Sequence, residues 1–120
     1  MKKFDADGKI NFVDENNVFV GYDLNQNCCE NADWFISKMK PKKIEESKEL
    51  NFDNFVFDKD FFEENVLDQD EVEDGGSALF RLVGKNNEEA YLCIFNSHNG
   101  YYGHGFEMKI SGEEVRSGTL

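Results

Sequence analysis

Three cysteines and two histidines are the residues of this 120-residue chain that could ligate a metal or form a nucleophile and its base. Zinc sites usually space paired cysteines by two to four residues, whereas Cys28 and Cys29 are adjacent and poorly placed to share one ion. A nucleophilic cysteine needs a neighbouring imidazole, and the carboxylate of Glu30 would oppose a thiolate here. The sequence therefore leaves open, as an alternative, a small metal- or thiol-dependent enzyme that uses Cys28, Cys29, His98 and His104, with Cys93 packed inside an apolar strand.

A second candidate for chemistry is the stretch DADGKINF near the N-terminus, which has the acidic spacing of part of a calcium-binding loop. Asp5, Asp7 and Gly8 would take the third, fifth and sixth loop positions, but Lys3 would then stand at the first. A cation at the first ligand position repels calcium. We expect a turn that leads into the first strand, with no bound metal and no cofactor.

Negative charge is concentrated in one quarter of the chain. Residues 44–74 contain thirteen acidic residues against Lys48 and Lys59, which gives −11 of the total net charge of −12. An acidic surface repels nucleic acid and anionic membranes, so we expect the partner to be a basic protein. The alternative is a solvated surface that serves only solubility. Apolar residues interleave with these acids, which predicts folded structure in this segment; they are Phe52, Phe55, Phe57, Phe61, Phe62, Val66 and Leu67.

Length and composition predict one domain spanning residues 1–120. A hydrophobic content of 39%, with 14% aromatic residues, is enough to build a single core. No apolar run approaches the roughly 20 residues that cross a bilayer, and the N-terminus lacks the apolar stretch of a signal peptide. Adjacent cysteines do not make a disulfide framework, which favours reduced thiols and a cytoplasmic location.

Apolar alternation predicts a hairpin over residues 9–24 with its turn at residues 14–17. The spacing then becomes helical from Asn27, which forms a capping-box pattern with Glu30, up to Pro41. Weaker patterns follow: a short strand at residues 55–57, a helical turn within residues 60–67 and an acidic loop at residues 68–76.

Strand patterns return in the last third of the chain, at residues 78–83, 90–95, 106–110 and 115–119. Residues 90–95 are apolar on both faces, so this strand should be central in its sheet. Together the elements predict an α+β fold: a mostly antiparallel sheet of five to seven strands with one main helix packed on a face. Residues 96–107, rich in glycine and tyrosine, make either a tight bend or a recognition surface.

The acidic block, the small size and the lack of a catalytic set are similar to those of the small cytoplasmic immunity proteins that bacteria make against nuclease toxins, such as those of contact-dependent growth inhibition systems. The stretch CCENADWFI is also similar to a segment of small bacterial and phage proteins. The first resemblance implies a non-enzymatic inhibitor that covers the basic active-site cleft of a toxin nuclease. A phage or host regulatory module that inhibits a nucleic-acid-binding protein is the other possibility that the sequence leaves open. The residues expected to bind the partner are Asp58, Asp60, Phe62, Glu63, Glu64, Asp68, Asp70, Glu71, Glu73, Tyr101 and Tyr102.

Overall fold

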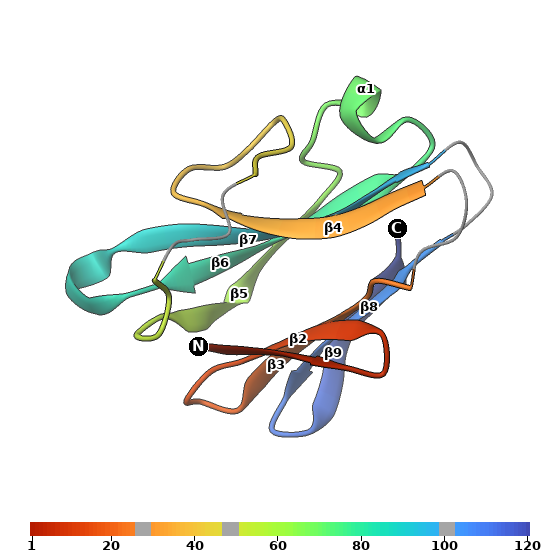
Figure 1. Ribbon diagram of the computed structural model, residues 1–120. Coiled ribbons are helices and arrows are strands. Elements are labelled where there is room, and N and C mark those ends of the chain that lie inside the picture. The colour runs from red at the N-terminus through yellow and green to blue at the C-terminus, as the bar shows by residue number, and fades with distance from the viewer. Residues whose placement is uncertain (26–29, 47–50, 99–102) are drawn as a thin grey trace.

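The protein forms two antiparallel sheets that pack face to face (Figure 1), in a computed structural model that describes residues 1–25, 30–46, 51–98 and 103–120. The five-stranded sheet has the order β1-β2-β3-β8-β9, with the bounds Lys2–Ala6, Lys9–Val13, Val18–Asp23, Gly105–Ile110 and Glu113–Thr119. The four-stranded sheet has the order β4-β7-β6-β5, with the bounds Glu30–Ser37, Glu89–His98, Gly76–Val83 and Val56–Glu64. Within the described ranges, helix is limited to α1 (Gln69–Val72) and a 3₁₀ turn (Lys85–Asn87).

The expected α+β fold, a sheet of five to seven strands with one main helix, is wrong. The strands form two sheets, and most of the segment assigned to the helix is strand β4. This strand pairs with β7 along its whole length, from Glu30 opposite His98 to Ser37 opposite Tyr91. Ala32, Trp34 and Ile36 are buried on its inner face and Phe35 and Ser37 on its outer face, so the apolar pattern lost the period of two that marks a half-exposed strand. Met39, which helical spacing would have placed in the core, is 75% exposed.

The main core lies between the two sheets. The ring centroids of Phe12 on β2 and Trp34 on β4 lie 5.1 Å apart across the interface between the sheets, with the rings edge to face. The Tyr22 hydroxyl of β3 donates a hydrogen bond of 2.7 Å to the Phe95 carbonyl of β7. Burial of apolar and aromatic surface from both sheets is the main source of stability in such a sandwich.

Strand β7 is central, as its sequence predicted, and both of its faces are buried. Leu92 and Ile94 face the main core, whereas Tyr91, Cys93 and Phe95 belong to a second apolar cluster on the outer face of the four-stranded sheet. Residues 38–46 and α1 cover this outer face, and both lie above the sheet in Figure 1. Nothing among the described residues covers the outer face of the five-stranded sheet in the same way.

The hairpin over residues 9–24 is confirmed as β2 and β3, and the strands expected at residues 78–83, 106–110 and 115–119 are confirmed within β6, β8 and β9. Strand β1 was not expected, because it is an edge strand with all five residues exposed. The expected helical turn within residues 60–67 is wrong: β5 continues to Glu64, and the helical turn is α1 inside the expected acidic loop. No helix in the described part of the chain is both long and apolar enough to cross a membrane.

Candidate functional site

The most acidic surface feature is the acidic turn, residues 68–74, which contains α1. Its seven residues include five acids and no base. Asp68, Asp70, Glu73 and Asp74 are exposed, whereas Glu71 is half-buried. The acidic turn therefore presents four carboxylates to solvent over a short length of chain.

Apolar side chains fix the acidic turn to the outer face of the four-stranded sheet. Leu67 and Val72 are 5% and 3% exposed and lie in the second apolar cluster, which also contains Phe35 and Leu79. The Ser77 hydroxyl of β6 accepts hydrogen bonds from the backbone N–H groups of Val66 and Leu67, at 3.0 and 3.1 Å. These contacts fix the chain where it enters the turn.

Backbone hydrogen bonds fix the rest of the acidic turn. The N–H of Asp68 donates to the Lys42 carbonyl at 2.7 Å, and the N–H of Asp74 donates to the His98 carbonyl at 2.9 Å. The Glu71 carboxylate accepts the N–H of Ile44 at 2.8 Å, which joins the turn to residues 38–46. The exposed carboxylates are thus carried on a rigid support.

Like charges held this close repel one another, and this repulsion lowers the stability of the folded protein unless a cation is nearby. Within the described part of the chain, none of Asp68, Asp70, Glu73 and Asp74 forms an ion pair. The side chain of Asp68 makes no capping hydrogen bond at the start of α1 either. Among the described residues, therefore, no cation offsets the repulsion between these carboxylates, and a cationic partner would relieve it.

The acids of β5 are partly neutralised within the chain. Asp58 pairs with Arg81 at 3.0 Å, and Arg81 also pairs with Glu89, so both carboxylates help to raise the pKa of the Arg81 guanidinium. Glu63 pairs with Lys40 at 2.8 Å. Of the expected partner-binding acids in this strand, Asp60 and Glu64 are exposed and form no ion pair with another described residue.

Phe62, expected as an apolar anchor for a partner, is half-buried and faces the interior. Its ring lies 5.4 Å from Phe80 and 5.8 Å from Phe106, and the Arg116 guanidinium stacks over it at 5.2 Å. This position makes Phe62 part of the main core. The other two expected anchors, Tyr101 and Tyr102, lie outside the described residues.

The described residues of the thiol and metal alternative do not converge. Cys93 lies in the second apolar cluster, and burial raises the pKa of its thiol well above its usual range. His104 is 2% exposed, and its Nδ1 lies 2.6 Å from the Asp23 carbonyl near the end of β3. No group of three potential metal ligands occurs among the described residues; Cys28 and Cys29 lie outside them.

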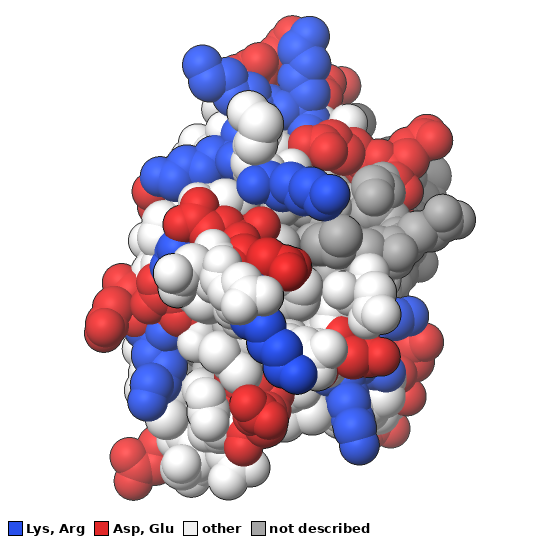
Figure 2. Space-filling model, turned by 90° about the vertical axis from the view of Figure 1, so that its left-hand side faces the viewer, with Lys and Arg blue, Asp and Glu red and all other residues white. Residues whose placement is uncertain are grey.

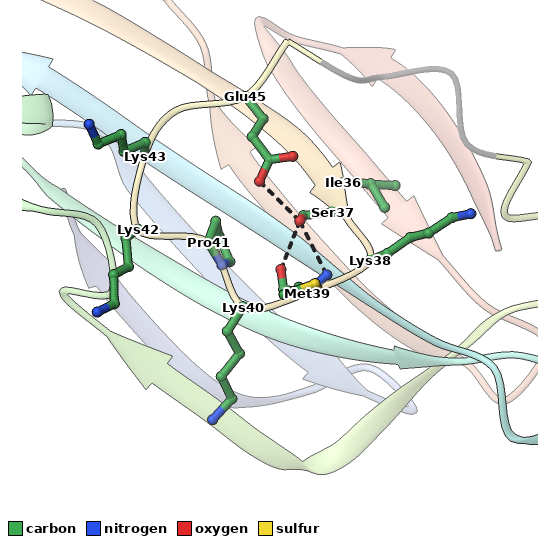
Figure 3. Close-up of a pocket in the computed structure, with 9 residues that line it drawn as sticks. All are labelled: Ile36, Ser37, Lys38, Met39, Lys40, Pro41, Lys42, Lys43 and Glu45. Carbon is green, nitrogen blue, oxygen red and sulfur yellow. Dashed lines mark hydrogen bonds between the residues drawn. The ribbon is translucent and has the colours of Figure 1, made fainter.

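A basic loop, residues 38–43, lies beside the acidic turn and was not recognised as a feature in the sequence. It contains four lysines and lines an open pocket of 670 Å³ together with Ile36, Ser37 and Glu45 (Figure 3). The Ser37 hydroxyl lies 2.7 Å from the Met39 carbonyl and 3.0 Å from a Glu45 carboxylate oxygen, which holds the loop in place. The lysine side chains splay away from one another in Figure 3, so they do not form a convergent anion site.

Opposite charges meet where the basic loop and the acidic turn lie side by side, because the N–H of Asp68 donates to the Lys42 carbonyl. Figure 2 shows acidic and basic side chains interleaved over the side that faces left in Figure 1. A partner for the acidic turn must therefore be cationic where it meets residues 68–74 and must tolerate lysines beside them. The run KMKPKK was the sequence signal for the basic loop, but it was interpreted as the end of a helix.

Comparison with known proteins finds no match among protein-family models, curated proteins or solved structures.

Proposed function

We propose that this protein is a non-enzymatic inhibitor of a basic protein and that it docks through the acidic turn. The observation that carries the proposal is the group of exposed carboxylates at Asp68, Asp70, Glu73 and Asp74, held on a rigid support and without ion pairs among the described residues. Preorganised charge binds without first losing conformational entropy, which favours tight association. Complementary charge also steers the encounter and accelerates it.

A nuclease active-site cleft is the kind of basic surface that this arrangement fits best. Such a cleft binds polyphosphate through lysine and arginine, so carboxylates on a fixed surface can occupy the phosphate positions. The resemblance to small immunity proteins favours a toxin nuclease as the target. The neighbouring Glu64 and Asp60 extend the same charge along the end of β5.

The test is inhibition of a purified basic nuclease domain; if a gene beside that of this protein encodes a toxin nuclease, its nuclease domain is the first target to assay. A charge-reversed variant carries Asp68→Lys, Asp70→Lys, Glu73→Lys and Asp74→Lys. A matched control variant changes four exposed acids elsewhere in the chain: Glu15, Asp53, Glu88 and Glu113, each to Lys. Both variants change the net charge from −12 to −4, because each reversal adds two units.

We expect the wild-type protein and the control variant to inhibit hydrolysis of nucleic acid, and the charge-reversed variant to lose at least about 100-fold in affinity. Inhibition by the wild type should weaken as salt rises, because surface charges more than about 8 Å apart are screened at physiological ionic strength. Circular dichroism and thermal melting check that each variant is folded. Equal inhibition by all three proteins would show that the acidic turn does not bind the target.

A further inference from the structure

The outer face of the five-stranded sheet lies on the side of the molecule opposite the acidic turn (Figure 1). We infer that this face binds the same face of a second copy of the chain, which gives a two-fold symmetric dimer. The inference is independent of the proposed inhibitor function. It rests on the charge of the face, on the side chains at its two margins and on its size.

The register of the strands places the outward side chains of this face in three rows that cross all five strands. The central row runs from Phe4 on β1 through Asn11, Gly21 and Glu107 to Ser117 on β9. Lys2 and Glu114 stand at the two ends of a second row, which contains Phe19 at its centre. The third row runs from Ala6 to Thr119.

The middle of this face is closely packed. A Cβ atom on Gly21 would meet both the Asn11 Oδ1 and the Phe19 Cε1 at 3.0 Å, so there is little room for a side chain at this position. Phe4 is 46% exposed at one margin, where it offers an aromatic side chain to a neighbour. At the opposite margin the small residues Gly105, Ser117 and Thr119 leave room for such a ring.

The charge of this face differs from that of the rest of the protein. Its outward charged residues are three bases and three acids, so its net charge is zero: Lys2, Lys9, Lys109, Asp23, Glu107 and Glu114. The rest of the chain has 13 − 3 = 10 bases and 25 − 3 = 22 acids, and therefore carries the whole net charge of −12. This face is where two copies of so acidic a protein can approach with the least repulsion.

The charges at the two margins of the face complement each other. Glu107 is already paired within the chain, with Lys9 at 3.7 Å and with Lys109 at 3.9 Å. Lys2 on β1 and Glu114 on β9 form no ion pair among the described residues.

Consider a two-fold axis that is parallel to β3 and lies between the facing five-stranded sheets of the two copies. This axis brings β1 of one copy over β9 of the other. Lys2 then faces Glu114 of the partner subunit, and Phe4 faces the small residues at the opposite margin. Asp23, on the strand that the axis follows, faces its own copy, and this repulsion weakens the dimer.

The size of the face sets the strength of the dimer. Five strands about 4.8 Å apart and five residues of about 3.3 Å each give a footprint of about 24 by 17 Å, or about 400 Å² per copy. The two copies together would bury about 800 Å², a value that treats each face as a plane without side chains. This area is below the roughly 1,200–2,000 Å² of stable complexes and is typical of transient ones. We therefore expect a reversible dimer with a dissociation constant in the micromolar range.

A charge swap between Lys2 and Glu114 tests both the dimer and its axis by sedimentation equilibrium. Within one chain these residues lie four strand spacings apart, about 19 Å, so they can interact only between copies. Lys2→Glu alone and Glu114→Lys alone should each raise the dissociation constant about tenfold, because two pairs become repulsive. The double variant should restore it to within about twofold of the wild-type value.

The two single variants also separate this interface from a simple effect of net charge. Lys2→Glu makes the chain more negative by two units, and Glu114→Lys makes it less negative by two units. General repulsion between the copies therefore predicts that the first variant weakens the dimer and the second strengthens it. The proposed interface predicts that both variants weaken the dimer. Phe4→Asp should weaken it about 100-fold, whereas Met39→Asp, at a residue that is 75% exposed on the basic loop, should not. A wild-type protein that stays monomeric up to about 1 mM, or a double variant that does not recover, would overturn the inference.

Discussion

Asp14 is the residue whose loss we expect to cost the most stability for the smallest change in side-chain volume. Its carboxylate is 6% exposed in the turn between β2 and β3. Oδ1 accepts hydrogen bonds from the N–H groups of Asn16 and Val18, both at 2.9 Å, and Oδ2 accepts the N–H of Phe57 at 2.8 Å. One side chain thus fixes the hairpin turn and ties it to the start of β5 in the other sheet.

The magnitude follows from which donors would lose their partner. In Asp14→Ala the N–H groups of Val18 and Phe57 stay buried with no acceptor in place, whereas the N–H of Asn16 is nearer to water. A buried donor without a partner costs about 1–3 kcal/mol, so the two donors together predict a loss of about 2–6 kcal/mol in the free energy of unfolding. Asp14→Asn keeps one acceptor oxygen but turns an amide NH₂ toward one of the donors. Its loss in the free energy of unfolding should be about half that of Asp14→Ala.

Urea unfolding followed by circular dichroism measures this loss as a lower transition midpoint with an unchanged slope. The control is Asp60→Ala, at an exposed acid of β5 without an ion pair among the described residues, which should change the free energy by less than about 0.5 kcal/mol. An Asp14→Ala protein as stable as the control would refute the reasoning, because the hydrogen bonds between the two sheets would then contribute nothing net.

Two further predictions test the packing around β7. Gly75→Ala should lower the free energy of unfolding by at least about 2 kcal/mol, because its Cβ would lie 1.7 Å from the Asn96 carbonyl oxygen. The adjacent Gly76→Ala, whose Cβ would meet the Leu120 Cδ2 at 3.5 Å, is the matched control and should cost much less in urea unfolding. In a protein carrying Cys28→Ser and Cys29→Ser, Cys93 should react with a thiol reagent only after unfolding, because burial raises the pKa of its thiol. Above about pH 8.5 the Cys93 thiol loses its proton in the unfolded chain but keeps it in the native protein. The free energy of unfolding should therefore fall by up to about 1.4 kcal/mol per pH unit above that value. Cys93→Ala should remove this dependence on pH.

The sequence predicted the strands that are buried on one face and bounded by clear turns. Residues 9–24 alternate cleanly, and the polar turn at Asp14–Asn17 precedes a strand whose inward residues Val18, Val20 and Tyr22 are fully buried. The pattern of β5 was readable only at its start, because a register shift between Phe57 and Phe62 breaks the alternation. That shift lets both rings face the core although they are five residues apart.

The helix expected around residues 27–40 failed for a different reason. Ala32, Trp34 and Ile36 alternate toward the main core, but Phe35 is buried on the other face and hides the period of two. Aromatic and β-branched residues in WFI favour a strand, and pairing with β7 outweighs a capping pattern that stabilises a helix by only about 1 kcal/mol. A strand that is buried on both faces has no alternation of apolar and polar residues. The sequence alone therefore showed no sign of the second apolar cluster, and β4 was mistaken for a helix.

The sequence predicted which segment is acidic, but it did not predict which of its carboxylates are exposed and without ion pairs. The sequence located the acids, but it could not distinguish Asp58 and Glu63, which pair with Arg81 and Lys40, from Asp68 and Asp70, which do not pair within the described residues. Those ion pairs join segments about 20 residues apart that meet only because β5, β6 and the basic loop lie side by side. Long-range pairing of this kind depends on the topology, which the incorrect helix had obscured.

The positions of the two proposed surfaces make them separable and give the dimer a consequence for binding. The acidic turn covers the outer face of the four-stranded sheet, whereas the dimer face is the outer face of the other sheet, so a dimer holds its two acidic turns pointing away from each other. Each turn can then bind its own target, and a target displayed in many copies is held more strongly by the dimer than by a monomer. Phe4→Asp should therefore leave inhibition of a single soluble target unchanged while it removes the gain on a clustered one. Reversal of the acidic turn should do the opposite: it removes inhibition, and because it reduces the magnitude of the negative net charge it leaves the dimer at least as strong as in the wild type.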